Sequence, residues 1–137
     1  MSADTTTDSA DFYALEDLLD ADEQAYLHSV RDFMTSEVEP TVNRHWQRGS
    51  FPFEIVPGFR QLGLAGLPYH GFGCPGKSCR LDGMVTMELA RTDRSIATFA
   101  AVHGGLAMDS IYLCGSEEQN SATCRRWRAT RRSAPSG

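Results

Sequence analysis

Apolar residues recur at helical spacing through the first part of the chain. Between residues 20 and 39 they fall at intervals of three and four positions, which predicts an amphipathic helix with one buried face. Asp20 is expected to cap this helix, because Glu23 stands three residues later as in a capping box. Pro40 is expected to end or kink the helix, since proline has no amide hydrogen to donate. A short second helix is predicted through Trp46.

Glycine and proline divide the rest of the chain into further helices. A short helix is expected to stop at Gly63, and residues 68–79, which are rich in glycine and proline, form a turn cluster. Two more helices are expected over 82–93 and 95–113, the second capped by Ser95. The 95–113 helix is apolar nearly all round, which predicts burial on every side. The pattern contains no convincing strand, so we expect an all-α fold, an up-and-down bundle of five or six helices.

Composition favours a single soluble domain. The chain has 137 residues, of which 41% are hydrophobic and 23% charged, both ordinary values. No apolar run reaches the roughly 18 residues that span a bilayer. The first residues are acidic and polar, unlike a signal peptide. We therefore expect a cytoplasmic protein with no membrane partner. Its four cysteines lack a CxxC pair, so free thiols and no metal site are expected.

Charge is distributed unevenly along the chain. The net charge is −5, yet all 18 acidic residues precede residue 119, and the last 18 residues carry five arginines and no acid. The body is thus at −10 (8 basic minus 18 acidic residues) and the tail at +5. We divide the chain into a disordered start at 1–11, a helical domain at 12–119 and a basic tail at 120–137. One interpretation is a small helical binding module that uses the Arg-rich tail as its contact.

A glycine-rich stretch formally matches a nucleotide-binding motif. Residues 71–78 read GFGCPGKS, which fits the GxxxxGK[ST] spacing of a P-loop. A P-loop follows an apolar β-strand, whereas this stretch follows LGLAGLPYH, which glycine and proline interrupt. A P-loop nucleotide binder is therefore kept as an alternative function.

Three ordered stretches resemble a known family. They are LGLAGL at 62–67 followed by GFGC at 71–74, ELARTD at 88–93, and a segment from Thr98 that ends in GSEEQ at 115–119. Over residues 12–119 the chain resembles the N-terminal helical domain of acyl-CoA dehydrogenases, particularly the branch that includes glutaryl-CoA dehydrogenases. The order and spacing of the stretches carry this resemblance more than any one of them.

The resemblance implies an FAD-dependent oxidation of an acyl-CoA thioester. In the family a glutamate removes the α-proton and a hydride leaves the β-carbon for the flavin. That glutamate lies in the C-terminal helical domain, and most flavin contacts come from the middle and C-terminal domains. We therefore expect no catalytic or cofactor-binding residue in this chain, which would be inactive alone. The implied partners are the acyl-CoA, an electron-transfer flavoprotein or other acceptor, and further copies of the protein, with no nucleic acid.

The resemblance also places two candidate substrate-binding residues. Glutaryl-CoA dehydrogenases hold the distal carboxylate of their substrate with an arginine and a glutamate, where this chain has Ala97 and Ala90. Thr98 falls where the family has a serine. Because a carboxylate clamp normally uses arginine, Ala97 and Thr98 predict a plain short or medium acyl chain. His103 is interpreted as a buried histidine with a satisfied hydrogen bond, not a catalytic base.

The basic tail suggests a frame error. After GSEEQ the family usually continues with a segment like KQRWLPPMAR, whereas this chain reads NSATCRRWRATRRSAPSG. Back-translated with GC-rich codons and shifted by one nucleotide, the tail contains the segments PPMAR and IGAFG, close to the family's continuation. We therefore hypothesise a one-nucleotide frame error near residue 119 that truncates an acyl-CoA dehydrogenase. The nucleotide sequence of the gene tests this hypothesis directly.

Overall fold

Local capping signals set the first long helix. In the computed structural model, which describes residues 13–128, a 3-10 turn η1 (Leu15–Leu18) precedes α1 (Ala21–Phe33). The Asp20 carboxylate accepts the backbone N–H of Glu23 at 2.8 Å, so the predicted cap is confirmed.

The helix that starts at α1 does not end at Pro40, so of the two outcomes expected there, an end or a kink, the first is wrong. The chain runs without a break through a π-helical segment, η2 (Met34–Val38), into α2 (Glu39–Arg48). Pro40 lies within the first two positions of α2, after a wide turn in which the N–H of Glu39 donates to the Met34 carbonyl. The wider turn accommodates proline, because the π-helical segment changes the hydrogen-bond pattern just before the residue that lacks an N–H.

The middle of the chain is short helices and turns. A 3-10 turn η3 (Phe53–Ile55) leads into α3 (Val56–Leu62), which stops at Gly63 with φ +70° as expected. The predicted turn cluster contains a small antiparallel hairpin, β1 (His70–Gly71) with β2 (Cys74–Pro75).

The next two helices begin earlier than expected. Helix α4 (Cys79–Thr92) is capped by Ser78, whose hydroxyl accepts the Leu81 N–H at 3.1 Å. Helix α5 (Arg94–Ala101) is capped by Asp93, not by Ser95, because Asp93 has the extended backbone that a cap needs and accepts the Ile96 N–H at 2.9 Å. Asp93 also accepts the Trp46 indole N–H at 2.7 Å, which ties α2 to the start of α5.

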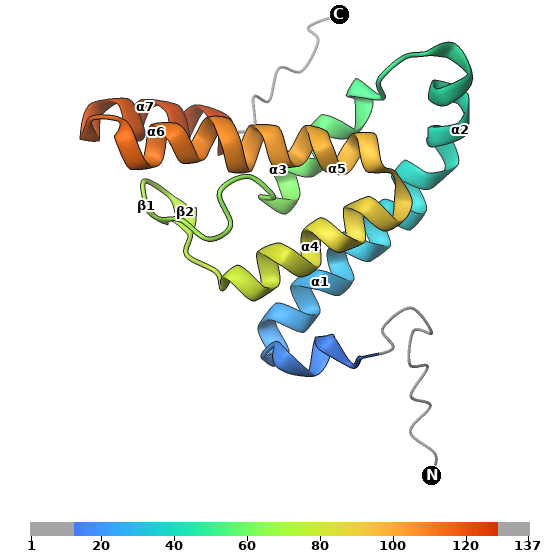
Figure 1. Cartoon of the computed structure of the whole chain (residues 1–137), viewed down its shortest axis with the longest axis horizontal. Coiled ribbons are helices and arrows are strands. Elements are labelled where there is room, and N and C mark those ends of the chain that lie inside the picture. The colour runs from blue at the N-terminus through green and yellow to red at the C-terminus, as the bar shows by residue number, and fades with distance from the viewer. Residues whose placement is uncertain (1–12, 129–137) are drawn as a thin grey trace, which may run out of the picture.

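The long apolar helix predicted at 95–113 is continuous in the structure. It consists of α5, a second π-helical segment η4 (Val102–Ala107) and α6 (Met108–Cys114). A final helix, α7 (Glu117–Arg128), turns back over α6 (Figure 1). Helix α7 continues past residue 119 into the segment that we assigned to the basic tail. The rest of that tail, at 129–137, and the first residues of the chain, at 1–12, lie outside the described residues.

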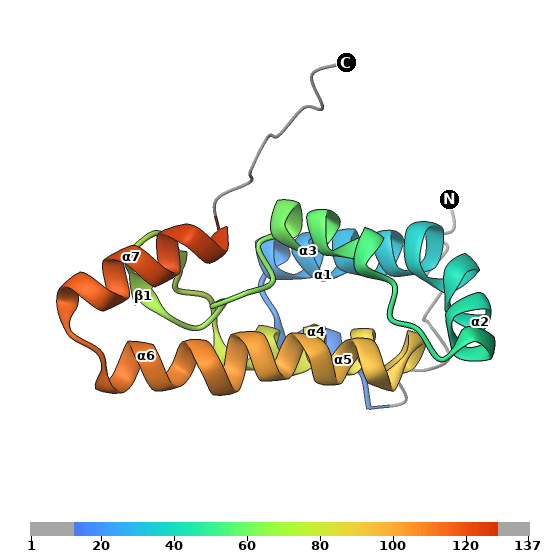
Figure 2. The same cartoon turned by 90° about the horizontal axis from the view of Figure 1, so that it is seen from above.

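The helices form two layers. Figure 2 shows α1, α2 and α3 on one side and α4, α5 and α6 on the other, with the β1–β2 hairpin near α6 and α7. Counting each uninterrupted stretch once, the described part of the chain has five helices, which confirms the all-α bundle. The core lies between the layers; its fully buried large side chains are Leu27, Met34, Leu67, Leu81, Ile96, Met108, Val30 and Val38.

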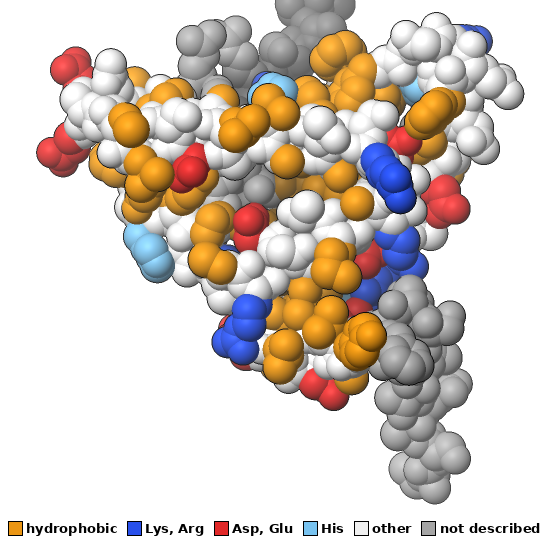
Figure 3. Space-filling view, in the orientation of Figure 1, with side chains coloured by type: hydrophobic (Ala, Val, Ile, Leu, Met, Phe, Trp, Pro, Cys, Tyr) orange, Lys and Arg blue, Asp and Glu red, His pale blue; other side chains and the backbone are white. Residues whose placement is uncertain are grey.

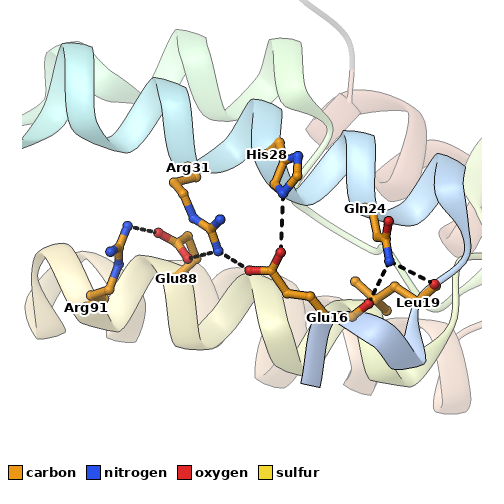
Figure 4. A network of polar contacts seen from close by, with 7 residues as sticks. All are labelled: Glu16, Leu19, Gln24, His28, Arg31, Glu88 and Arg91. Atoms are coloured by element: carbon orange, nitrogen blue, oxygen red, sulfur yellow. Dashed lines mark hydrogen bonds and ion pairs between the residues drawn. The ribbon is translucent and has the colours of Figure 1, made fainter. Parts of the chain in front are cut away.

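A network of ion pairs connects α1 in the first layer with α4 in the second (Figure 4). The buried carboxylate of Glu88 on α4 pairs with Arg91 and, at 3.2 Å, with Arg31 on α1. Arg31 also pairs with Glu16 of η1, which His28 contacts from α1. Burial alone would lower the pKa of Arg31, but its hydrogen bonds to the two glutamates outweigh burial and raise it. The network therefore holds a permanent positive charge between two carboxylates.

Candidate functional site

The long helix Arg94–Cys114 exposes an apolar surface. The expectation that this helix is buried on every side is wrong for the described chain: Leu106 is 68% exposed and Leu113 71%, whereas Met108 between them is fully buried. The two-layer packing explains the difference, because neighbouring elements cover one side of the helix. Figure 3 shows hydrophobic side chains at the surface along this helix. Apolar surface of this kind commonly marks an interaction site.

Thr98 lies on this exposed side, and Ala97 does not. Thr98 is exposed, and its hydroxyl donates to the Arg94 carbonyl at 2.8 Å, one turn back along the helix. Ala97 is 8% exposed and belongs to the core. The structure therefore places the two predicted substrate-binding residues on adjacent sides of α5.

The residues that continue the Thr98 surface were not among the site residues predicted from the sequence. We call the exposed residues Thr98, Ala101, Val102, Gly105 and Leu106 the apolar face. They recur at intervals of three and four positions, as neighbours on one side of a helix do. That spacing, counted from Thr98, was the signal that could have identified them.

The π-helical segment η4 shapes the middle of this helix. The phenol of Tyr69 donates to the Gly104 carbonyl at 2.9 Å, and a Cβ added at Gly104 would lie 3.9 Å from the Cα of Ala65. Burial raises the pKa of Tyr69, helped by the nearby carboxylate of Asp109, so the phenol stays a donor at neutral pH. The Tyr69 ring stacks on Tyr112 at 4.6 Å. These contacts hold the loop before the hairpin against the helix and fix the position of the apolar face.

His103 differs from expectation in its burial. Its Nδ1 donates to the Phe99 carbonyl at 2.8 Å, so the expected hydrogen bond is confirmed. The side chain is exposed, however, and lines a cavity of about 270 Å³ between α3 and the α5–η4 helix. The interpretation as a buried histidine is therefore wrong.

The glycine-rich stretch at 71–78 does not form a P-loop. Its strands are two residues long and antiparallel, and the turn between them is made by Phe72 and Gly73 with φ +51° and +83°. At the start of α4, where a P-loop would hold phosphate, the Ser78 N–H donates to the Glu23 carboxylate at 3.2 Å. A carboxylate at this position would repel a phosphate.

The geometry of the glycine-rich turn also decides whether this turn could bind the pyrophosphate of a flavin. FAD carries a pyrophosphate, which needs N–H donors and positive charge. The glycine-rich turn presents Glu23 instead, so the described residues do not fit a flavin pyrophosphate there. Among the residues that the structure describes, no group of three or more His, Cys, Asp or Glu could hold a metal ion, and Cys79 and Cys114 are free thiols.

The described part of the chain is a helical bundle with one exposed apolar helix face. Residues 20–128 match the acyl-CoA dehydrogenase N-terminal domain. The chain therefore belongs to the acyl-CoA dehydrogenase family, through its N-terminal domain. It is 26% identical over 91 residues to an acyl-CoA dehydrogenase of Bacillus subtilis, an alignment that covers 66% of this chain and 24% of that protein.

Two solved structures share the fold. A glutaryl-CoA dehydrogenase from Mycobacterium smegmatis in complex with FADH2 superposes with a TM-score of 0.79 at 34% identity, over 86% of this chain and 31% of that one. Another structure of glutaryl-CoA dehydrogenase from the same organism gives a TM-score of 0.76 at 28% identity, over 84% of this chain and 30% of that one. The chain thus spans about a third of these proteins and about a quarter of the Bacillus relative.

The helix Arg94–Cys114 also meets the length and hydropathy expected of a membrane span, with 17% of its most apolar window buried. Length and composition do not distinguish a membrane span from a helix that packs on protein. The family match favours the second interpretation.

Proposed function

We propose that this chain supplies the N-terminal helical wall of the acyl-CoA site in an FAD-dependent acyl-CoA dehydrogenase. The observation that carries the proposal is the apolar face, which the described helices leave exposed. A wall of this kind would exclude water from the thioester and hold an acyl chain by apolar contact. Bound flavin would accept a hydride, and it requires parts of the protein beyond this chain.

The residues on and beside the apolar face set the proposed substrate preference. At position 97 an alanine methyl group offers no charge for a distal carboxylate, and the hydroxyl of the adjacent Thr98 is engaged with its own helix. A dicarboxylyl thioester would bring its distal carboxylate to position 97, where this chain has no arginine to receive it. The proposed substrate of the complete enzyme is therefore the CoA thioester of a plain short or medium acyl chain. An electron-transfer flavoprotein or a similar acceptor would reoxidise the reduced flavin.

On its own, the chain is proposed to be inactive and cytoplasmic. The described residues offer no place for the flavin pyrophosphate at the glycine-rich turn, and the chain spans about a third of its structural neighbours. An absorbance spectrum of the purified chain, recorded after incubation with FAD and removal of free flavin, tests the first point. We expect no flavin band and no dehydrogenation of butyryl-CoA. A stoichiometric FAD band would overturn this part of the proposal.

A chimera tests the substrate-binding role. Residues 20–119 of this chain would replace the matching segment of the Mycobacterium smegmatis glutaryl-CoA dehydrogenase. We expect the chimera to oxidise butyryl-CoA and to lose most activity on glutaryl-CoA. Ala97→Arg should then restore activity on glutaryl-CoA, because arginine can pair with the distal carboxylate.

A matched control separates this role from a general effect of charge. Ser110→Arg adds the same charge to an exposed position farther along the helix, and it should leave the preference unchanged. If Ala97→Arg and Ser110→Arg change the ratio of kcat/KM values equally, position 97 does not contact the substrate.

A further inference from the structure

We infer that the cavity between α3 and the α5–η4 helix is a binding site for a small aromatic carboxylate. The cavity has a volume of about 270 Å³. A cavity of about 150 Å³ is known to hold a benzene ring, so this one has room for a ring and a short acidic arm. The inference concerns this chain alone and does not rest on the proposed dehydrogenase function.

The walls of the cavity are aromatic. Phe59 is fixed by an edge contact with Phe33, with ring centroids 5.9 Å apart, and Phe99 lies against Phe51 at 4.6 Å. The imidazole of His103 lies 4.1 Å from the Phe99 ring. Held rings of this kind offer faces and edges to another ring, which favours a flat aromatic guest.

Small residues leave the space between these walls open. Gly63 ends α3 in the left-handed conformation, with φ +70°, and turns the chain so that Ala65 lines the cavity beyond it. Ala100 lines the cavity from α5. None of these residues carries a side chain long enough to fill the volume. The cavity therefore results from the shape of this turn and from residue size.

The charge at the cavity favours an anion. Arg60 lines the cavity from the last turn of α3, and no lining residue is acidic. Within the part of the chain that the structure describes, Arg31 and Arg91 pair with carboxylates, whereas Arg60 has no such partner. A guanidinium can bind a carboxylate through two parallel hydrogen bonds. The chemistry that completes this site is therefore an aromatic ring with a carboxylate on a short arm.

The site is separate from the apolar face. With 100° of rotation per residue, Phe99, Ala100 and His103 are turned by about 100–200° from Thr98 around the helix. Thr98 and Val102 do not line the cavity. A ligand here would contact a different side of the helix from the proposed acyl chain.

Ligand-observed NMR on the 137-residue chain tests the inference with phenylacetate as the probe. We expect saturable binding with a Kd of about 1 mM or tighter, as ten non-hydrogen atoms can provide. Acetate and 2-phenylethanol, which each lack one recognition element, should bind about tenfold more weakly or worse. No saturation by about 10 mM phenylacetate, or equal binding of either control compound, overturns the inference.

Two substitutions locate the site. Arg60→Gln removes the charge at an exposed position and should weaken phenylacetate binding about tenfold or more, while Arg48→Gln on α2 should leave it unchanged. Ala100→Leu should abolish binding by filling the cavity, with thermal unfolding used to show that the variant is folded. Unchanged affinity in Arg60→Gln, or an equal loss in Arg48→Gln, contradicts the inference.

Discussion

Two neighbouring residues on the long helix should differ sharply in their contribution to stability. Met108 is fully buried and Leu106 is 68% exposed, although two positions separate them. Truncating a fully buried methionine to alanine costs about 2–5 kcal/mol, because transfer energy is lost and a cavity remains. Leu106 has about a third of its surface buried, so Leu106→Ala should cost about 0.5–1 kcal/mol, that share of a full leucine burial. We therefore expect a difference of about 2 kcal/mol in the free energy of unfolding.

Urea unfolding followed by circular dichroism measures this difference. Both variants should keep the m-value of the parent chain, which shows that the same surface is exposed on unfolding. Leu113→Ala, at a residue 71% exposed, is the matched control and should behave as Leu106→Ala does. Each kcal/mol corresponds to about 3–4 °C in Tm for a chain of this size, so thermal unfolding gives an independent reading.

Equal costs at Leu106 and Met108 would refute the reasoning. That result would mean that the exposed side of the helix is covered in solution, for example by a second copy of the chain. A dependence of Tm on protein concentration would then accompany it, since association stabilises the folded state by mass action. A monomer whose Leu106→Ala variant costs as much as Met108→Ala would contradict the two-layer packing itself.

Three further changes test other parts of the fold. Asp20→Ala should cost about 0.5–2 kcal/mol in urea unfolding, because it removes the N-cap of α1, and Asp20→Asn should restore most of the loss. Gly66→Ala should lower the free energy of unfolding by about 2–4 kcal/mol, because φ is +74° and the new Cβ would lie 2.5 Å from the Met108 methyl carbon. Gly49→Ala is the control: φ is +61° but the space around it is open, so this change should cost about 1 kcal/mol. Burial raises the pKa of Asp82, which means that folding disfavours the ionised form of this carboxylate. The protonated carboxyl group therefore stabilises the fold at low pH, and this contribution is lost as the pH rises through the raised pKa. Asp82→Asn should therefore raise Tm at neutral pH and not at acidic pH, and an equal effect at both pH values would contradict this account.

The sequence determined most of the helices, because their signals are local. Asp20 caps α1 and Gly63 ends α3 through contacts within a few residues, which can be read along the chain. The misassigned cap at Ser95 also depends on a local choice, but two neighbouring candidates compete. Asp93 lies two residues before Ser95, and only the backbone conformation selects between them.

Tertiary structure decided which sides of the helices are buried. The sequence of the 95–113 helix is apolar nearly all round and cannot show how many neighbours will cover it, so Leu106 and Met108 look alike until the layers are assembled. The formal P-loop match failed for the same kind of reason: the spacing of 71–78 is a property of the sequence, whereas the Glu23 carboxylate at the Ser78 amide comes from a distant helix. Periodicity and capping act over a few residues, and burial and electrostatic environment depend on contacts between residues far apart in the chain.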